Sequence, residues 1–470
     1  MGSTFFGLNT ALTGLTAQQK ALYTTTHNLA NASTEGYTRQ RVTMAAAPAF
    51  ANPSANTMLS AGQIGTGVEV KAFARLRDQF IDVQYRQQYA AMGQWDARSD
   101  QLGRINQVIS EPSDTGLSAA LERFWASWHA LSIAPESASA REAVRTTADT
   151  VTAAFKSLNT QLTQAQTETD AKIADRVSVA NSLAAQVNTL NQQIAKVVNL
   201  GQQPNDLMDE RDRLLDQLGN IALITVTTPS ATNGKVSVSI GGQLLVDSTT
   251  NAVNALAVDS SGNVTVGGTG VTLTDGSLRG LIDVRYSVIG GTSGYLARLD
   301  NLANALVSSV NTQHAAGYAL DGTTGNSFFT GSGAAGIALH SGIVGSLNKI
   351  AAASTAADVP GGAGNAVLIA QVKNLNQVIG GTTTTVDGYY QSIVSKIGID
   401  ADQAFRLQLV QKGVTDATAN RRDAVAGVNM DEELSEMVKF QKSYNAAARM
   451  MTTIDEMLET IVNRMGIVGR

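Results

Sequence analysis

ESASAREAVRTTADTVTAAFKSLNTQLTQAQTETDAKIADRVSVANSLAAQVNTLNQQIAKVVNL, residues 136–200, is the stretch that decides the fold, because it contains no glycine and no proline. Inside a helix these residues cost about 1 and about 3 kcal/mol relative to alanine. Apolar residues recur at alternating steps of four and three from Val144 to Ala165, and a similar series resumes at Ala180, which is the spacing of a coiled-coil seam. An unbroken helix would reach about 100 Å, whereas a break near residue 169 would give a hairpin. Both alternatives are rod-like.

The segments that flank this tract also have helical patterns. Trp125 and Trp128 lie on the same helix face as Leu121 and Leu131, so we expect them to pack in a core and not to form a ligand platform. The predicted helices are residues 77–110, 117–131, 295–313 and 387–425.

The middle of the chain interrupts the helices, because residues 219–381 hold 26 of the 43 glycines. Alternating apolar residues predict short strands between residues 221 and 285, the first at Ile221–Val226, and Asn233-Gly234 predicts a hairpin turn. Residues 321–365 are rich in Gly, Ala and Ser and give no assignment.

Both ends of the chain are amphipathic. Leucines form a stripe near the start, and apolar residues recur at steps of four and three near the end, where Asn429 and Glu432 have N-cap and N3 spacing and Gly466 stands where a helix would stop. We expect the two terminal helices to form a coiled-coil pair and the interface with other copies of the chain. The predicted interface residues are Leu8, Leu12, Leu15, Leu22, Leu29, Leu434, Met437, Phe440, Tyr444, Met451, Ile454, Leu458, Ile461 and Met465.

These ends are not expected to fold alone. Burying five leucines gives roughly 1.5–3 kcal/mol each, while ordering some 25 residues costs about 1–2 kcal/mol each. We therefore expect the terminal helices to stay disordered until another surface covers the stripe.

The predicted fold class is mainly α and elongated, with terminal coiled-coil helices and a long helical rod domain into which a Gly-rich β or mixed outer domain is inserted. The expected domains are residues 1–40 with 428–470 (terminal helices), residues 41–220 with 386–427 (helical rod), and residues 221–385 (outer domain, with 295–315 helical).

Composition excludes several classes of function. The net charge of −5 and the absence of a basic run make nucleic acid a poor partner. With no cysteine, the chain has no disulfide framework and no Cys-ligated zinc. No segment approaches the ~18 consecutive apolar residues of a membrane span, and the N-terminus lacks a cleavable signal pattern. We expect neither a membrane span nor a cleaved leader.

Candidate catalytic motifs are weak. Gly331–Gly336 spell G-x-G-x-x-G, but Phe328-Phe329 gives only a stub of the strand that should precede a dinucleotide motif, and the nearest later acid is Asp358. A lone motif of this kind favours a small-residue surface loop. His27, His129, His314 and His340 form no metal motif, and we expect capping or surface roles for them.

Five acids, Asp206, Asp209, Glu210, Asp212 and Asp216, cluster in one predicted helix and could suggest a metal or acid–base site. Arg211 and Arg213 are interleaved with them, so a solvated or salt-bridged helix face is favoured. No Ser/His/acid arrangement is present, and we expect no catalytic residue, cofactor or metal.

Several sequence motifs resemble those of a known protein family. Residues 24–40 read TTTHNLANASTEGYTRQ and resemble the N-terminal signature of flagellar rod, hook and hook-associated proteins, although proline is common in that family where this chain has Glu35. Residues 427–433, GVNMDEE, and 440–449, FQKSYNAAAR, resemble the C-terminal signature. The signature residues are Asn28, Ala30, Asn31, Gly36, Tyr37, Arg39 and Gln40.

Three internal strings narrow the resemblance to the hook-associated protein 1 family of the hook–filament junction. They are NDLMDERD at 205–212, NTQHAAGY at 311–318 followed by Phe328-Phe329, and NRRDAVAGV at 420–428. Compared with longer relatives, residues 330–365 are short, which suggests a reduced outermost domain.

The resemblance implies a structural axial component of the bacterial flagellum that joins hook to filament, is needed for filament assembly, and is not an enzyme. The implied location is extracellular, at the hook–filament junction, after export with an uncleaved N-terminus. The implied partners are a homo-oligomeric ring, the hook protein, the second hook-associated (junction) protein, a cytosolic export chaperone at the C-terminal helix and the flagellar type III export apparatus.

Three alternatives stay open. Flagellin or the second junction protein shares the logic of paired terminal helices but lacks the string from Asn28 to Tyr37. A nucleotide-binding oxidoreductase built on residues 331–336 belongs to a different class. A secreted adhesin, whose β-rich middle binds a host ligand, could coexist with a junction role.

Overall fold

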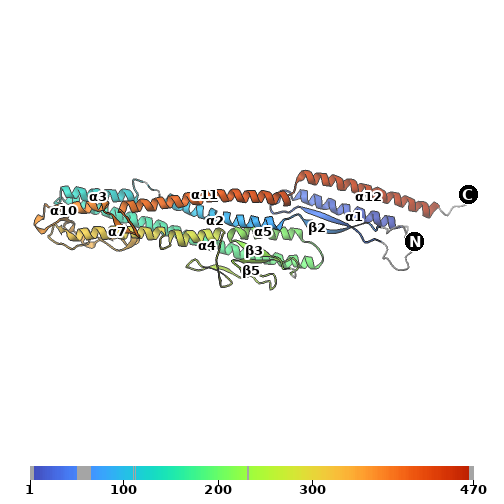
Figure 1. Ribbon diagram of the computed structural model, residues 1–470, viewed down its shortest axis with the longest axis horizontal. Coiled ribbons are helices and arrows are strands. Elements are labelled where there is room, and N and C mark those ends of the chain that lie inside the picture. The colour runs from blue at the N-terminus through green and yellow to red at the C-terminus, as the bar shows by residue number, and fades with distance from the viewer. Residues whose placement is uncertain (1–4, 50–64, 110, 112, 230–231, 465–470) are drawn as a thin grey trace.

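The computed structural model describes residues 5–49, 65–109, 111, 113–229 and 232–464. Helices run along the length of an elongated molecule, and the start of α1 and the end of α12 lie at the same tip (Figure 1). The fold class predicted from the sequence, mainly α and elongated with small sheets, is confirmed.

Helices form most of the chain. They are α1 (Phe6–Ala30), α2 (Gln79–Ile109), α3 (Leu117–Ile133), α4 (Ala138–Asn199), α5 (Asn205–Ile221), α6 (Ser277–Ile282) with a π-helical continuation (Asp283–Ile289), α7 (Tyr295–Ala316), α8 (Gly333–Gly336), α9 (Ser341–Gly345), α10 (Gly364–Gln371), α11 (Val386–Ala426) and α12 (Met430–Arg464).

The strands are short and form separate antiparallel sheets. They are β1 (Gln40–Ala46), β2 (Val68–Arg75), β3 (Ile224–Thr227), β4 (Ser237–Ile240), β5 (Gln243–Val246), β6 (Leu256–Val258), β7 (Val264–Val266), β8 (Thr269–Val271), β9 (Tyr318–Ala319), β10 (Phe329–Thr330), β11 (Ala338–Leu339), β12 (Ala351–Ala353), β13 (Gln377–Ile379) and β14 (Thr382–Thr384). Two sheets have three strands, in the orders β3-β4-β5 and β6-β7-β8, and the others are pairs.

Helix α4 is continuous over 62 residues, so of the two alternatives for this tract the unbroken rod is observed. The Ser137 hydroxyl caps its first turn by accepting a hydrogen bond from the Ala140 amide at 3.3 Å. The seam read from the sequence is its buried face, since Val144, Val151 and Phe155 are fully buried.

Two hydrophobic cores lie along the rod. One surrounds Trp128 and Phe124 of α3, which pack against Phe328 and the start of α4. The other joins the second half of α4 and α5 to the three-stranded sheets. Both Trp125 and Trp128 are buried in the first core, as predicted.

Two local predictions for the middle of the chain need correction. Ile221 ends α5, and the first strand begins only at Ile224. Asn233 and Gly234 both have positive φ, of 50° and 82°, but they lie within a longer loop between β3 and β4 and not in a two-residue hairpin.

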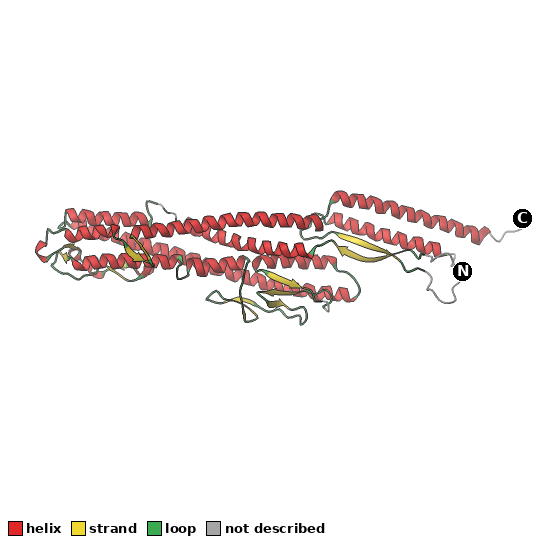
Figure 2. Ribbon diagram, in the orientation of Figure 1, coloured by secondary structure: helices red, strands yellow, loops and turns green. Residues whose placement is uncertain are grey.

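The β1–β2 hairpin runs beside α1 near the tip that holds the terminal helices (Figure 2). Its register pairs Gln40 with Arg75 at the end nearest the rod. The hairpin therefore bridges the terminal helices and the start of α2.

Candidate functional site: the terminal helix pair and its polar junction

Helices α1 and α12 pack against each other (Figure 1). Small residues line one face of α1, which is exposed at Gly7, half-buried at Thr10 and Gly14 and buried from Ala17 onwards, so the helix can approach its neighbours closely. They recur at steps of three and four and are Gly7, Thr10, Gly14, Ala17, Ala21, Thr24 and Asn28. Ala17 and Ala21 are buried, and the Ile454 side chain of α12 lies against Gly7.

The predicted leucine stripe of α1 flanks this small-residue face. Leu8, Leu15, Leu22 and Leu29 are half-buried, and Leu12 remains 43% exposed. The helix pair of a single chain therefore leaves part of the stripe uncovered.

Helix α12 divides its apolar residues in the same way. Its half-buried residues recur at steps of three and four and include Met437, Phe440, Tyr444, Met451, Ile454 and Leu458. Leu434 and Met457 are 41% and 60% exposed. The side chain of Ile461 and the whole of Met465 and Gly466 lie outside the described residues.

The start of α12 is capped as its spacing predicts. The Asn429 side-chain oxygen accepts hydrogen bonds from the amides of Asp431, at 3.0 Å, and Glu432, at 3.4 Å. Three acids in the first turn of α12 also suit the positive end of the helix dipole.

Asn28 anchors a buried network that we call the polar junction, whose central residues are Asn28, Tyr37, Arg39, Gln40, Asp209, Asp212 and Glu433. The Asn28 amide is 1% exposed and uses two donors and two acceptors. Its nitrogen donates to the Gln40 carbonyl at 2.8 Å and to Glu433 at 2.9 Å. Its oxygen accepts from the Tyr37 hydroxyl at 2.8 Å and the Gln40 amide at 3.0 Å. One side chain thus joins α1, β1 and α12.

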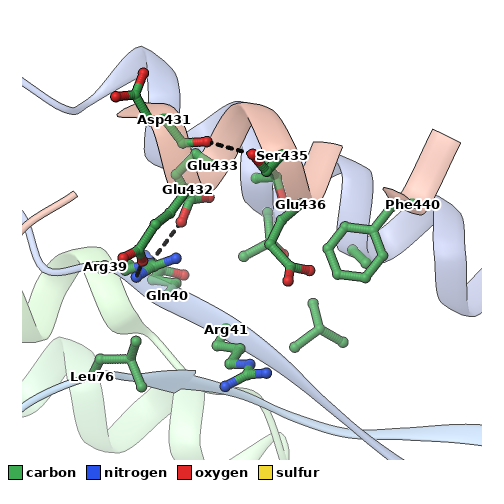
Figure 3. A pocket seen from close by; sticks show the side chains of 14 residues that line it. Arg39, Gln40, Arg41, Leu76, Asp431, Glu432, Glu433, Ser435, Glu436 and Phe440 are labelled. Atoms are coloured by element: carbon green, nitrogen blue, oxygen red, sulfur yellow. Dashed lines mark hydrogen bonds and ion pairs between the residues drawn. The ribbon is translucent and has the colours of Figure 1, made fainter. Parts of the chain in front are cut away.

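Arg39 is the second link to α12. Its Nε donates to Glu433 and its Nη1 to Glu432, both at 2.6 Å, and its amide donates to the carbonyl of Ala426 at the end of α11. Burial lowers the pKa of Arg39, but the two carboxylates outweigh burial and hold that pKa above its ordinary value. Arg39 and these two glutamates lie at the edge of a cavity of 490 Å³ between α1, β1 and α12, with Phe440 at the far side (Figure 3).

The acids of α5 supply the rod side of the polar junction. Asp209 accepts from the Thr38 amide at 3.0 Å and from Arg75 at 2.8 Å. Asp212 accepts from Arg75 at 2.8 Å and from Arg77 at 2.5 Å. These contacts tie the signature loop and β2 to α5.

The two aspartates differ in their pKa. Burial raises the pKa of Asp209 in spite of its contact with Arg75. Burial also acts to raise the pKa of Asp212, but the surrounding guanidinium groups, Arg77 foremost, outweigh it and lower that pKa. Asp212 is therefore held as a carboxylate, and its environment suits an ion-pair network.

Arg422 extends the network to α11. It donates to Asp216 at 2.6 Å, and its guanidinium lies 3.8 Å from the centroid of the Tyr85 ring on α2. Arg86 of α2 donates to the same carboxylate at 2.8 Å. Helices α2, α5 and α11 are thereby fixed to one another beside the terminal pair.

The remaining signature residues shape the turn between α1 and β1. Gly36 has a φ of +82°, which favours glycine, and the Tyr37 hydroxyl reaches both Asn28 and His27. The Gln40 side chain donates to Asp206 at 2.9 Å and accepts from Asn205 at 3.0 Å. Ala30 is exposed, and the Asn31 side chain bonds locally: it donates to the His27 carbonyl at 3.0 Å and accepts from the Thr34 hydroxyl at 3.2 Å.

The histidines follow the prediction only in part. His340 caps α9, and His129 is exposed. For His314 the expectation of a capping or surface role was wrong, because its ring is fully buried between Trp128 and Phe328. Nδ1 donates to the Asn326 carbonyl and Nε2 accepts from the Ala351 amide, so a neutral ring fits the core.

The G-x-G-x-x-G string lies in a loop and a four-residue helix. The amides of Gly333 and Ala334 donate to Asn304 and Asp300 at 2.8 and 2.7 Å. Side-chain oxygens of Asn304 and Asp300 thus already bind these amides, which argues against a phosphate cradle.

The interpretation of the α5 acids as salt-bridged is consistent with these contacts. Only Arg213 pairs along the helix, with Glu210 at 2.6 Å, while Arg211 points to Asn191 and Gly234. Within the described residues, no group of three or more His, Asp or Glu side chains is arranged to hold a metal ion. Over the same residues, no helix has the length and apolar character needed to cross a membrane.

Sequence reasoning missed two features of the site. The first is the series of small residues in α1, whose steps of three and four are visible in the sequence beside the leucines. The partners Arg75, Arg77, Arg86 and Glu433 had no local signal, because each contacts a residue more than 100 positions away.

Comparisons with known proteins agree with this architecture. The model of the flagellar hook-associated protein FlgK helical domain matches residues 102–329. Models of the flagella basal body rod protein and of the flagellar basal body rod FlgEFG protein C-terminal region match residues 8–38 and 424–465, the two terminal helices.

Relatives match over long stretches. The chain is 36% identical to flagellar hook-associated protein 1 of Bacillus subtilis over all of both chains. It is 30% identical to the protein of that name from Salmonella typhimurium, over 69% of this chain and 59% of that protein. A solved structure of the flagellar hook junction protein FlgK from Burkholderia pseudomallei shares the fold over 73% of this chain and all of that one, with a TM-score of 0.63 at 16% identity.

Three findings lead to one conclusion: a relative that matches over the full length of both chains at 36% identity, the matching helical domain, and the signature residues that meet in the polar junction. The chain belongs to the family of flagellar hook-associated protein 1, a structural component of the hook–filament junction.

Proposed function

We propose that the chain works as a structural subunit that adheres to further copies and to flagellar neighbours through its terminal helix pair, and that it catalyses no reaction. The observation that carries this proposal is the incomplete cover of α1 and α12. Leu12, Leu434 and Met457 keep 43%, 41% and 60% of their surface exposed, and Met430, Val438 and Met450 of α12 are exposed as well. Exposed apolar side chains that gather on one pair of helices favour protein–protein contacts.

The proposed interface is the set of terminal residues predicted from the sequence. Leu8, Leu15 and Tyr444 would gain cover on assembly, together with the exposed residues. Each fully covered leucine contributes roughly 1.5–3 kcal/mol, so added cover at several positions per subunit offsets part of the cost of ordering the ends. The terminal helices cover each other in the single chain, and their disorder in dilute solution remains a prediction.

The polar junction has a mechanical role in this proposal. Asn28 and Arg39 tie α1 and β1 to the start of α12, while Asp209 and Asp212 tie the same loop to α5. Buried, mutually satisfied hydrogen bonds fix one geometry. We infer that the junction sets the angle between the terminal helices and the rod, so that load passes from one to the other.

The finer assignments follow the same proposal. We propose residues 1–40 with 428–470 as the terminal domain, 41–220 with 386–427 as the rod, and 221–385 as the outer domain. The partners would be a homo-oligomeric ring, the hook protein, the second hook-associated protein, a cytosolic export chaperone at α12 and the flagellar type III export apparatus. The location would be the extracellular junction, reached without a cleaved signal.

A deletion strain tests the function. Cells that lack this chain should carry hooks without filaments in electron micrographs, and the wild-type gene should restore filaments. Leu12→Asp, which places a charge on the uncovered stripe, should fail to restore them although the chain is made and exported.

The matched control is Asn9→Asp, which adds the same charge three residues earlier at an exposed polar position of α1. It should restore filaments fully. Filaments of normal number on cells without the chain, or on cells with only Leu12→Asp, would overturn the proposed role.

A further inference from the structure

A second cavity, of 640 Å³, lies between β2, the start of α2, α5 and the loop after β3. Its wall carries the guanidinium groups of Arg75, Arg77, Arg86 and Arg211 and only two carboxylates, Asp82 and Asp212. Such an excess of positive charge in a concave site favours anions.

Three of these arginines already have carboxylate partners that offset their positive charge. Arg77 donates to both oxygens of Asp82 and to Asp212. Arg75 uses only its Nη1 for Asp209 and Asp212, and Arg86 uses its Nε for Asp216. Each guanidinium has five N–H groups, so Arg75 and Arg86 retain donors for a further partner.

Among the arginines of this cavity, Arg211 lacks a carboxylate partner. Its residue is 5% exposed, and its Nη1 donates to the Gly234 carbonyl at 2.7 Å and to the Asn191 side chain at 3.3 Å. Both acceptors are neutral, and no carboxylate of the described residues lies within ion-pair distance. Buried charges are usually paired or fully hydrogen-bonded. Arg141, also buried without a carboxylate, donates to three carbonyls, whereas the buried Nε of Arg211 has no hydrogen-bond partner among the described residues.

Charge balance around the cavity supports the same point. Burial, together with the neighbouring Arg75, Arg86 and Arg77, lowers the pKa of Arg211 to about 10, although Asp212 acts against this shift. The pKa of Arg77 is raised, because its two aspartates outweigh burial. An anion beside Arg211 would raise its pKa, as the two aspartates raise that of Arg77.

We propose that this cavity binds an oxyanion, a phosphate or a carboxylate group, through Arg211 with Arg75 and Arg86. The cavity exceeds the size of a bare ion, and Val226 and Val236 in its wall offer apolar contact to an organic part of the ligand. The oxyanion belongs either to a free small molecule or to an acidic side chain of another protein chain. This inference does not depend on the proposed assembly role.

Titration calorimetry on the full chain, at constant ionic strength, tests the site with inorganic phosphate and, in a second arm, with acetate. The wild type should bind at least one of them at a single saturable site, with a matching rise in melting temperature. A preference for phosphate points to a free phosphorylated molecule, and a preference for acetate points to a protein carboxylate.

Two variants locate the site. Arg211→Gln should weaken binding at least about tenfold, since it removes a charged donor. Arg213→Gln, on the same helix but paired with Glu210 outside the cavity, should bind like the wild type. Should Arg211→Gln fail to fold, Val83→Asp, which places a carboxylate at a half-exposed position of the cavity wall, should weaken binding to a similar extent.

The outcomes are decisive in either direction. Saturable binding that is lost in Arg211→Gln or Val83→Asp and kept in Arg213→Gln supports the oxyanion site. Absence of saturable binding of both ions to the wild type, or unchanged binding in the cavity variants, would overturn it.

Discussion

Asn28→Ala is the substitution that probes the polar junction most sharply. The Asn28 side chain is 1% exposed and makes four hydrogen bonds that join α1, β1 and α12. Alanine fits the helix, so the backbone of α1 is not disturbed. The effect of the change is therefore the loss of the network itself.

Its magnitude follows from the bonds lost. Three involve neutral partners, at about 1 kcal/mol each, and the bond to Glu433 involves a carboxylate, at about 1.5–3 kcal/mol. We expect a loss of about 4.5–6 kcal/mol of local stability, because the buried Gln40 amide and the Glu433 carboxylate would lose a partner. That corresponds to hydrogen exchange through local opening that is faster by about three to four orders of magnitude.

Hydrogen exchange of the amides of Thr38, Arg39 and Gln40 measures this loss directly. Asn31→Ala is the control, since Asn31 bonds only within its own turn, and it should change exchange less than about fivefold. Exchange in α4 should be unaltered in both variants. If Asn28→Ala behaves like Asn31→Ala, the junction does not hold the terminal helices to the rod.

Three further predictions concern the rest of the chain. Burial lowers the pKa of His314 from 6.5 to about 4, so the unfolded chain takes up a proton that the folded core excludes; stability should be complete above about pH 6.5 and fall by about 3 kcal/mol towards pH 4. Urea unfolding by tryptophan fluorescence should show this slope in the wild type but not in His314→Gln, and an equal slope in both would contradict it. Arg422→Ala, which loses an ion pair to α5 and the contact with the Tyr85 ring, should cost about 2–3 kcal/mol in the same assay, against less than about 0.5 kcal/mol for the exposed Arg421→Ala. Gly36→Ala should cost about 1–2 kcal/mol because of its positive φ, and a neutral effect on unfolding would show that the turn adopts another conformation.

The sequence predicts the rod well because its signal is local. The steps of three and four around Val144 and Phe155 report directly on the buried face of α4. The same reasoning fails for His314, whose burial depends on Trp128 and on Phe328 from distant segments. Its spacing of four residues from Val310 places His314 on the apolar face of α7, but that spacing does not say which aromatic side chains cover it.

The candidate site shows the same limit. The sequence motifs around Asn28, Asp209 and Arg422 can each be recognised on their own. That they meet in space depends on the tertiary fold, which the residue spacing within a motif does not predict. Arg75 and Glu433 complete the network from other elements, and an isolated arginine or glutamate in a sequence is most often a solvated residue. On α1, the leucines carry the stronger hydrophobic signal because they are large, whereas the close helix contact uses alanine and glycine.

The central claim is that other subunits cover the apolar surface which the terminal helix pair leaves exposed. An electron cryomicroscopy structure of the intact hook–filament junction is its most direct test. We predict that Leu12, Leu434 and Met457 are buried against neighbouring copies or adjacent flagellar proteins in that assembly. Finding these three side chains in contact with solvent in the assembled junction would contradict the account.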